Sequence, residues 1–201
     1  ARSDCEIVAA AEHNLEKAQA LEQLYGISVS QDYDAVLENP DVDFVSICTD
    51  FYLKHQLIPQ AVACGKHVMV DKAIARTVRE ARDIVQAVEG SAVKVALMYP
   101  SRFRPALRIL AEGLREDAYG RVVAYVHTSV KQFEGDLMSY VSYPTPARQN
   151  GGGELMNLGS HPVDYLYSVF GYPKRVYCHM VNAYFDEYRA FETEDIATLF
   201  C

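Results

Sequence analysis

Two short stretches of the sequence carry the residue types that could move a proton. Residues 65–73 read Gly-Lys-His-Val-Met-Val-Asp-Lys-Ala, which predicts a buried strand that delivers Lys72 at its carboxyl end. Residues 151–164 read Gly-Gly-Gly-Glu-Leu-Met-Asn-Leu-Gly-Ser-His-Pro-Val-Asp. Asn157 and His161 are four residues apart, so a helix would place them on one face. A lysine and an imidazole that converge on one cleft indicate proton transfer.

Each of these side chains also has an ordinary structural explanation. Lys72 could be a surface lysine after a strand, and His161 could be a satisfied histidine packed within its helix. Pro162 removes a backbone donor, so the helix should kink or restart with His161 near its cap. The glycine run could be no more than a flexible lead into that helix. Three further residues continue the polar face, namely Asp164, Tyr165 and Ser168.

Polar groups also follow three expected strands of the first half of the chain. They are Glu12, the pair Thr49 and Asp50, and the pair Asp71 and Lys72. The carboxyl ends of parallel strands share one edge of a doubly wound sheet, so these groups would line a common crevice. Any one of them alone could be a solvated loop residue, but together they favour a site.

Glu12 indicates which dinucleotide would bind. An acid at this place accepts hydrogen bonds from the adenosine ribose and disfavours a 2′-phosphate, so the expected cofactor is NAD rather than NADP. The glycine-rich phosphate turn should lie about 20 residues earlier. Only 11 residues precede Glu12, and the first glycine is Gly26. We therefore expect the chain to be truncated, without the first strand and the glycine-rich loop.

Composition excludes several other classes of protein. The 201 residues are half hydrophobic, and the formal net charge of −8 argues against nucleic acid as a partner. No apolar run reaches the length of a membrane span. The odd number of cysteines, five, and the absence of a Cys-x-x-Cys pair argue against a disulfide framework and favour a reducing, cytoplasmic location. The histidines lack ligand spacing, so no metal is expected.

The order of the elements predicts two domains. Residues 1–103 alternate strands and helices as a partial Rossmann-type parallel sheet does, and residues 104–201 suggest a partial α+β domain with an open, mostly antiparallel sheet. Expected strands are 6–11, 43–49, 67–70, 93–98, 122–130, 175–184 and 195–200, and expected helices are 14–24, 33–38, 57–63, 77–88 and 103–116. A long loop at 133–150 offers Tyr143 and Arg148 as possible substrate contacts, and Lys131 just before the loop is a third.

The two motifs together resemble those of the Gfo/Idh/MocA oxidoreductases. Residues 65–73 are similar to that family's Gly-Lys-His-Val-x-x-Glu-Lys-Pro signature, with Ala73 in place of the proline. Residues 152–164 resemble its Gly-Gly-x-x-x-Asp-x-Gly-x-His-x-x-Asp pattern, with Asn157 in place of the first acid. Residues 102–105 resemble its Arg-Phe-x-Pro crossover, so the likeness covers nearly the whole chain.

The resemblance implies hydride transfer between a nicotinamide cofactor and a hydroxyl-bearing carbon of a sugar, polyol or sugar derivative. It implies that Lys72 positions substrate and cofactor, that His161 is the general base, and that Asn157 takes the place of the partner acid. It also implies that Glu12 binds the ribose and that three residues lie along the cofactor, namely Cys48, Thr49 and Asp71. A homo-oligomer formed through the second sheet is a further implication.

Two other functions remain open on the sequence. A non-catalytic dinucleotide-binding regulatory protein of the same fold would bind the cofactor tightly without turnover. A glycosidase-like relative that uses its nicotinamide transiently would release a sugar without net reduction. Asp50, Phe51, Ala73 and Asn157, which depart from the family pattern, favour the first of these alternatives somewhat.

Overall fold

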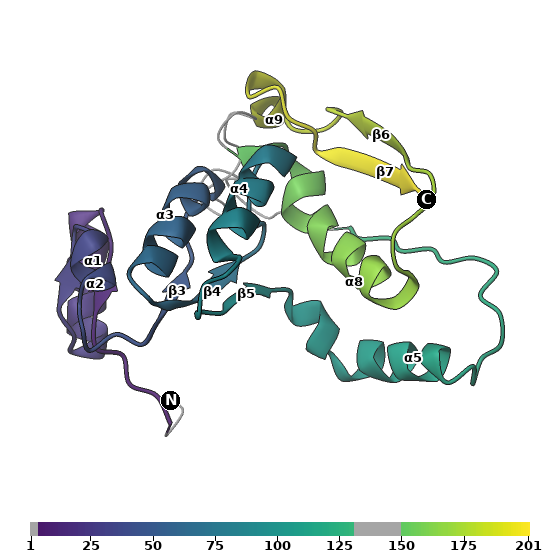
Figure 1. Cartoon of the computed structure of the whole chain (residues 1–201). Coiled ribbons are helices and arrows are strands. Elements are labelled where there is room, and N and C mark those ends of the chain that lie inside the picture. The colour runs from purple at the N-terminus through teal and green to yellow at the C-terminus, as the bar shows by residue number, and fades with distance from the viewer. Residues whose placement is uncertain (1–3, 131–149) are drawn as a thin grey trace. The chain divides into compact units, whose positions relative to one another are not determined.

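The structure is a computed structural model that describes residues 4–130 and 150–201 (Figure 1). The chain divides into two compact units, of which the first comprises Ala1–Thr49, Leu53–Val70 and Arg79–Ala96. The second comprises Asp50–Tyr52, Asp71–Val78 and Leu97–Cys201. The segment that begins at Asp71, directly after the strand that the sequence singled out, therefore belongs with the C-terminal part of the chain.

The first unit is an α/β structure with parallel strand pairs. Strand β1 (Ala10–Ala11) pairs in parallel with β2 (Val29–Ser30), and the order β3-β4-β5 forms a second sheet from Phe44–Ile47, His67–Asp71 and Val95–Met98. Strands β3 and β4 are parallel, with Ile47 opposite Val70, so their carboxyl ends meet at one edge. The helices are α1 (Leu15–Tyr25), α2 (Asp34–Leu37), α3 (Phe51–Ala63) and α4 (Val78–Val88).

Helix α1 begins and ends where its sequence predicts. The Asn14 side chain accepts a hydrogen bond from the backbone N–H of Lys17 at 3.0 Å, which satisfies one of the free donors of the first turn. Gly26 adopts a left-handed conformation, with φ of 67°, and its N–H bonds the Glu22 carbonyl. Asn14 and Gly26 thus bound the helix that was expected at residues 14–24.

Helix α3 begins at Phe51, six residues before the expected start at residue 57. The prediction missed this start because a polar residue, Lys54, interrupts the apolar pattern of the first turns. The buried positions Phe51, Lys54, Ile58 and Ala61 recur with helical spacing. Lys54 is completely buried among them, and a lysine at a core position conceals the first turn of the apolar stripe. The apolar periodicity is therefore visible in the sequence only from Leu57 onward.

The core of the first unit holds strand β4 in place. Val68 and Val70 of β4 are buried, and so are Ile58 of α3 and Ile84 of α4. The alternation of buried and more exposed residues along β4 follows the two-residue period of a strand. Because both valines are fixed by burial, the residues that follow Val70 leave the sheet at a defined point.

The second unit combines helices with an antiparallel strand pair. A 3-10 helix, η1 (Pro100–Phe103), leads into α5 (Pro105–Arg115), and a π-helical segment, η2 (Leu155–Gly159), leads into α8 (Ser160–Phe170). Strand β6 (Tyr177–Val181) pairs antiparallel with β7 (Ile196–Phe200), and the short helix α9 (Asp186–Ala190) lies between them in sequence. The expected antiparallel pairing of this region is confirmed.

The expected strand at 122–130 is wrong, since residues 121–130 form no helix or strand. Within the described ranges, β6 and β7 pair only with each other, so the backbone of 122–130 has no neighbouring strand to bond. Val123, Val126 and Val130 are exposed there, which shows that β-branched composition alone does not make a strand. Strand β2 and helix η1, in turn, are elements that the sequence reading did not anticipate.

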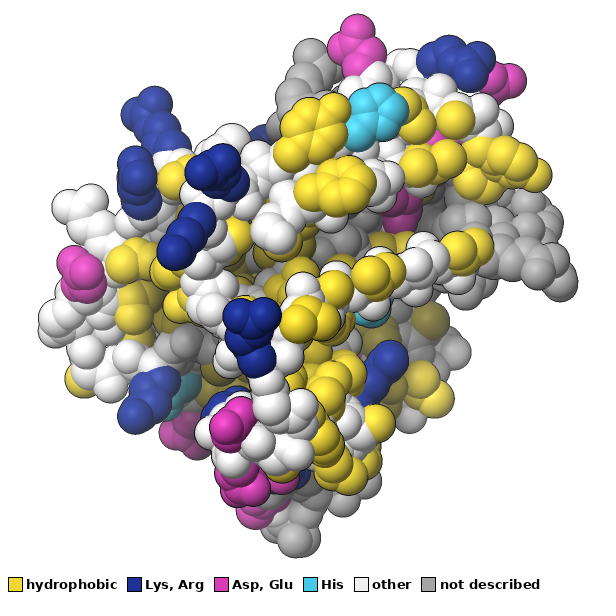
Figure 2. All heavy atoms as spheres, turned by 90° about the vertical axis from the view of Figure 1, so that its right-hand side faces the viewer, with side chains coloured by type: hydrophobic (Ala, Val, Ile, Leu, Met, Phe, Trp, Pro, Cys, Tyr) yellow, Lys and Arg dark blue, Asp and Glu magenta, His cyan; other side chains and the backbone are white. Residues whose placement is uncertain are grey.

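Several large apolar side chains lie on the surface of the strand pair. Tyr177, Met180, Ile196 and Phe200 of β6 and β7 are exposed, and Figure 2 shows many hydrophobic side chains on the face it presents. Exposed apolar surface of this kind marks places where another chain or segment can pack.

None of the helices within residues 4–130 and 150–201 combines the length and hydropathy that a bilayer crossing requires.

The buried Lys66 gives a stability prediction. Its Nζ donates to the carbonyl oxygens of Asn39 at 2.7 Å and Val42 at 2.8 Å, which fastens the start of β4 to the loop before β3. Replacing Lys66 with Met leaves both carbonyls without this donor, and we expect the free energy of unfolding to fall by about 1–3 kcal/mol. Urea unfolding measures the change, with the exposed Lys17→Met as control. Equal stability of the two variants would contradict the anchoring role.

Candidate active site

Lys72 contacts Asn157 directly, across 85 residues of sequence. Its Nζ donates to the Asn157 side-chain oxygen Oδ1 at 2.6 Å and to the Asn157 backbone carbonyl at 2.9 Å. The ring of Phe51 lies 5.9 Å from the same nitrogen, within the range of a cation–π interaction. Two of the residues that the sequence selected are thus brought together, and the ammonium group is held in one position.

The Asn157 backbone carbonyl, beside a π-helical turn, accepts hydrogen bonds from two side chains. Residues Leu155–Gly159 form a π-helical turn, in which a carbonyl bonds the amide five residues later. For Asn157 that residue is Pro162, which has no N–H to donate. The carbonyl accepts instead from Lys72 and from the Ser160 hydroxyl at 3.2 Å. Pro162, which the sequence marked as a complication, therefore cannot itself donate to this carbonyl.

The glycine run lets the backbone approach Glu194 closely. A Cβ at Gly153 would overlap the Glu194 carbonyl oxygen and lie 2.9 Å from the Glu194 nitrogen. The Glu194 carboxylate accepts the N–H groups of Gly153 at 2.9 Å and Leu155 at 2.8 Å, and its carbonyl accepts that of Glu154 at 3.0 Å. A carboxylate is a favourable acceptor at the start of a helix. Gly153 therefore allows a close backbone contact that positions the start of the helix.

Glu154 and Tyr188 extend the contact beyond Asn157, and the sequence reading missed both. The Asn157 side-chain nitrogen donates to the Glu154 carboxylate oxygens at 3.2 and 3.4 Å. The Tyr188 hydroxyl, from α9, donates to the same carboxylate. Glu154 lies three residues before Asn157, so helical spacing could have found it. No sequence signal links Tyr188, which lies 34 residues later.

His161 lies one turn beyond Asn157 and is partly buried. Its ring meets Tyr99 edge to face, with ring centroids 5.6 Å apart. Burial lowers the pKa of His161, and the positive charge of Lys72 lowers it further. Both effects favour the neutral imidazole, the form that can accept a proton. Its Nδ1 is buried without a hydrogen-bond partner among the described residues.

Tyr99 is a third residue that the sequence reading missed. It directly follows β5, so the rule that selected the residues after the other strands could have found it. Burial raises the pKa of Tyr99, although its hydrogen bond with Ser160 acts in the opposite direction. The phenol stays protonated at neutral pH and lies beside the imidazole of His161.

The remaining polar residues of the α8 face make structural contacts. Asp164 accepts hydrogen bonds from Arg102 through both carboxylate oxygens, one of them from Nε at 2.6 Å, which ties η1 to α8. Tyr165 is buried and donates its hydroxyl to the Leu107 carbonyl of α5 at 3.1 Å. Ser168 bonds the Tyr165 carbonyl at 2.7 Å. The first two contacts join α8 to η1 and α5, whereas the Ser168 bond lies within α8 itself.

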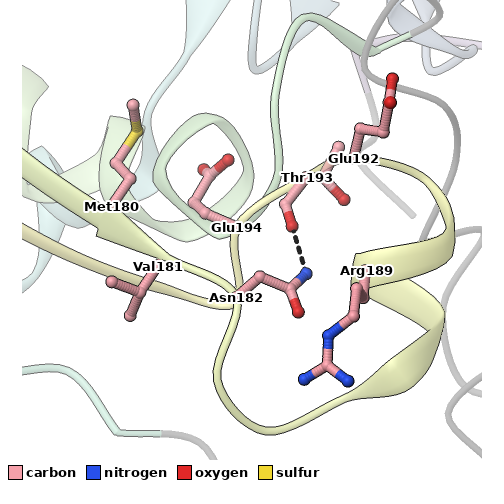
Figure 3. A pocket seen from close by; sticks show the side chains of 7 residues that line it. All are labelled: Met180, Val181, Asn182, Arg189, Glu192, Thr193 and Glu194. Atoms are coloured by element: carbon pink, nitrogen blue, oxygen red, sulfur yellow. Dashed lines mark hydrogen bonds between the residues drawn. The ribbon is translucent and has the colours of Figure 1, made fainter.

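A hollow of about 380 Å³ lies beside β6 and α9 (Figure 3). Its lining comprises Met180, Val181, Asn182, Arg189, Glu192, Thr193 and Glu194. The Asn182 side chain donates to the Thr193 carbonyl at 2.7 Å, and Arg189 pairs with Asp186 at 2.9 Å. Lys72, Asn157 and His161 do not line this hollow, but Glu194 links it to the π-helical turn.

The candidate cofactor residues follow strand ends. Glu12 follows β1, and its carboxylate accepts the Asn14 N–H at 2.9 Å at the start of α1. Cys48 and Thr49 follow β3, with the Cys48 sulfur 3.6 Å from the Ser46 hydroxyl, and Asp71 closes β4. The candidate substrate residue Arg148 lies outside the described residues, as do Lys131 and Tyr143. In the part of the chain that the structure describes, no three His, Cys, Asp or Glu residues cluster as metal ligands would.

Two family models match nearly the whole chain. Residues 1–99 match the oxidoreductase family with an NAD-binding Rossmann fold, and residues 107–201 match the Gfo/Idh/MocA C-terminal domain. The matched ranges contain Lys72 in the first case and Asn157 with His161 in the second.

Individual relatives resemble the chain over part of their own length. It is 26% identical to levoglucosan dehydrogenase of Pseudarthrobacter phenanthrenivorans over 77% of this chain and 40% of that protein. It is 31% identical to D-glucoside 3-dehydrogenase of Escherichia coli over 86% of this chain and 48% of that protein. A solved levoglucosan dehydrogenase in complex with NADH has a similar fold, with a TM-score of 0.85, 22% identity and coverage of 96% of this chain and 53% of that one. The chain spans about half the length of the curated relatives it matches.

The lowered pKa of His161 can be measured by NMR. Removing the charge of Lys72 with Lys72→Met should raise the pKa of His161 toward its ordinary value, because a nearby cation disfavours the imidazolium. Titration of the imidazole resonances reports the change, with Arg108→Met on α5 as control. Since the folded-state pKa lies below the unfolded one, His161 should also destabilise the fold as pH falls from the unfolded pKa toward the folded pKa. A His161 pKa that is identical in both variants would contradict the proximity of the two groups.

Proposed function

This chain belongs to the Gfo/Idh/MocA family of oxidoreductases, and from that membership we propose an NAD-dependent dehydrogenase. It would transfer hydride between the nicotinamide and a hydroxyl-bearing carbon of a sugar, polyol or sugar derivative. The names of the relatives, a levoglucosan dehydrogenase and a D-glucoside 3-dehydrogenase, support this class of substrate. The single structural observation that carries the proposal is the placement of Lys72 against Asn157 with a neutral His161 one turn away.

In substrate oxidation the hydroxyl must lose its proton as the carbon loses hydride. A neutral imidazole can accept that proton, and His161 has the lowered pKa that keeps it neutral. When bound, the nicotinamide supplies the hydride acceptor. The ammonium of Lys72, fixed by Asn157, can donate a hydrogen bond to the substrate oxygen and so hold it beside the imidazole.

The residues present suit a dinucleotide without a 2′-phosphate. Glu12 offers a carboxylate at the end of β1, and such a group accepts hydrogen bonds from ribose hydroxyls. A 2′-phosphate there would meet a like charge. We therefore propose NAD as the cofactor in preference to NADP, with Cys48, Thr49 and Asp71 along its path.

The exposed apolar side chains support a proposal for the oligomeric state, and the free cysteines support one for the cellular location. We propose a homo-oligomer, a dimer or tetramer, formed through the second-unit sheet, whose apolar side chains Tyr177, Met180 and Phe200 are exposed. All five cysteines are free, which supports a reducing cytoplasmic location. The domain boundary that we propose lies near residue 103.

Steady-state kinetics with a panel of sugars and polyols test this function. In the protein expressed from its complete coding sequence, Lys72→Ala and His161→Asn should each lower kcat by about 10²–10⁴-fold, because Lys72 orients the substrate oxygen and His161 accepts its proton. The exposed Lys174→Ala is the matched control and should retain wild-type kinetics. Nicotinamide absorbance reports turnover directly.

Two outcomes would overturn the proposal. One is full turnover in Lys72→Ala, since the amine would then lie outside the chemistry. The other is tight NAD binding by the wild type without reduction or oxidation of any substrate in the panel, which would favour the regulatory alternative.

A further inference from the structure

Glu154 lies directly behind Asn157 in the chain of hydrogen bonds that begins at Lys72. Lys72 donates to the Asn157 oxygen at 2.6 Å, and the Asn157 nitrogen donates to the Glu154 carboxylate at 3.2 and 3.4 Å. Every bond in this series runs in the same direction, from the cation through the neutral amide to the anion. One amide group therefore connects the lysine charge to a carboxylate.

An asparagine needs a hydrogen-bond acceptor on its other side if its amide oxygen, and not its nitrogen, is to point at a lysine. Its amide has an acceptor oxygen and a donor nitrogen of nearly the same size, so its orientation is set by the groups on either side. Lys72 has only donors, and the Glu154 carboxylate has only acceptors when ionised. The pair therefore fixes one orientation of Asn157, with its oxygen toward the amine.

Glu154 itself is held from a distant element. The Tyr188 hydroxyl donates to its carboxylate, and Tyr188 is only 1% exposed. Burial raises the pKa of Tyr188, and the hydrogen bond to Glu154 raises it further, so the phenol remains a donor. The Glu194 carboxylate binds the N–H groups on both sides of Glu154, those of Gly153 and Leu155. The side chain and backbone of Glu154 are thus both anchored.

We propose that Glu154 is a positioning residue, which supplies through Asn157 a negative charge that offsets the ammonium of Lys72. A partly buried ammonium group is stabilised by an opposite charge nearby, and the neutral amide of Asn157 carries none. Glu154 provides such a charge one amide farther away. The inference rests on the proposed function only for its consequence on turnover.

A charge swap separates this role from a merely structural one. Glu154→Gln keeps the size of the side chain but removes the charge, and Asn157→Asp places a carboxylate directly against Lys72. The double variant E154Q/N157D can keep all three contacts of the series, because its glutamine can donate to its aspartate and accept from Tyr188; only the bond between residues 154 and 157 reverses its direction. The negative charge then lies at residue 157 instead of residue 154.

Trace acetylation of the Lys72 amine, quantified by mass spectrometry across pH, reads the charge effect without turnover. Among the described residues, Asp71, Arg104 and Asp164 act electrostatically on His161 beside Lys72, and Glu154 and Tyr188 continue the hydrogen-bond series from Lys72. All except Glu154 are unchanged in these variants. We expect E154Q to move the midpoint of acetylation to lower pH by about one unit, and E154Q/N157D to return it close to the wild-type midpoint. Glu112→Gln, on the exposed face of α5, is the matched control.

Kinetics and thermal unfolding complete the test. E154Q should lower kcat about 10- to 100-fold with little change in KM, and the double variant should recover most of the loss. N157D alone brings two carboxylates together, so the double variant should unfold at a higher temperature than either single variant. That comparison remains informative if one single variant folds poorly.

Three results would overturn the inference. They are an acetylation midpoint unmoved in E154Q, a double variant that behaves like E154Q in acetylation, and a double variant no more stable than its less stable parent. A wild-type protein without nicotinamide turnover on any sugar or polyol would count against the proposed function alone, because acetylation and unfolding do not depend on catalysis.

Discussion

The site depends on one interaction, the contact between the ammonium of Lys72 and the oxygens of Asn157. Burial of Val68 and Val70 fixes the strand that leads to Lys72, and close backbone packing of Gly153 against Glu194 fixes the start of the helix that carries Asn157. The same cation, together with burial, keeps His161 neutral. A single charge thus both places a donor and helps to set the protonation state of the neighbouring base.

The segment between β6 and β7 supports this contact by binding Glu154, the residue to which Asn157 donates. Tyr188 binds Glu154, and Glu194 binds the backbone on either side of it. Asp195 anchors the same loop by accepting three backbone N–H groups, at 2.7 to 2.9 Å, from residues 183–185. These bonds outweigh the effect of burial and lower the pKa of Asp195, so the anchor remains charged. A segment far from Lys72 in sequence therefore supplies the contacts that hold Glu154, the residue to which Asn157 donates.

Strand ends and helical spacing were sufficient to find the central residues of the site. Contacts between segments that are distant in sequence could not be predicted in this way. Lys72 follows from a strand end, Asn157 and His161 from helical spacing, and the bounds of α1 from Asn14 and Gly26. Tyr188 could not be found, because only tertiary packing brings it to Glu154. The buried Lys54 concealed the start of α3, and the β-branched residues of 122–130 suggested a strand that needs a partner to exist. The hydrophobic pattern of the sequence indicates which residues can be buried. Whether a strand forms also depends on a neighbouring strand with which it can pair.

A double-mutant cycle on the free energy of unfolding tests the central contact most directly. It compares Lys72→Met, Asn157→Leu and the double variant with the wild type, so that the coupling energy isolates the bond between the two side chains. The bond between Lys72 and the Asn157 carbonyl is retained in Asn157→Leu, so the cycle reports mainly the side-chain link. We predict a coupling of about 1–3 kcal/mol, the range of a hydrogen bond to a charged group. A coupling below about 0.3 kcal/mol would contradict the account.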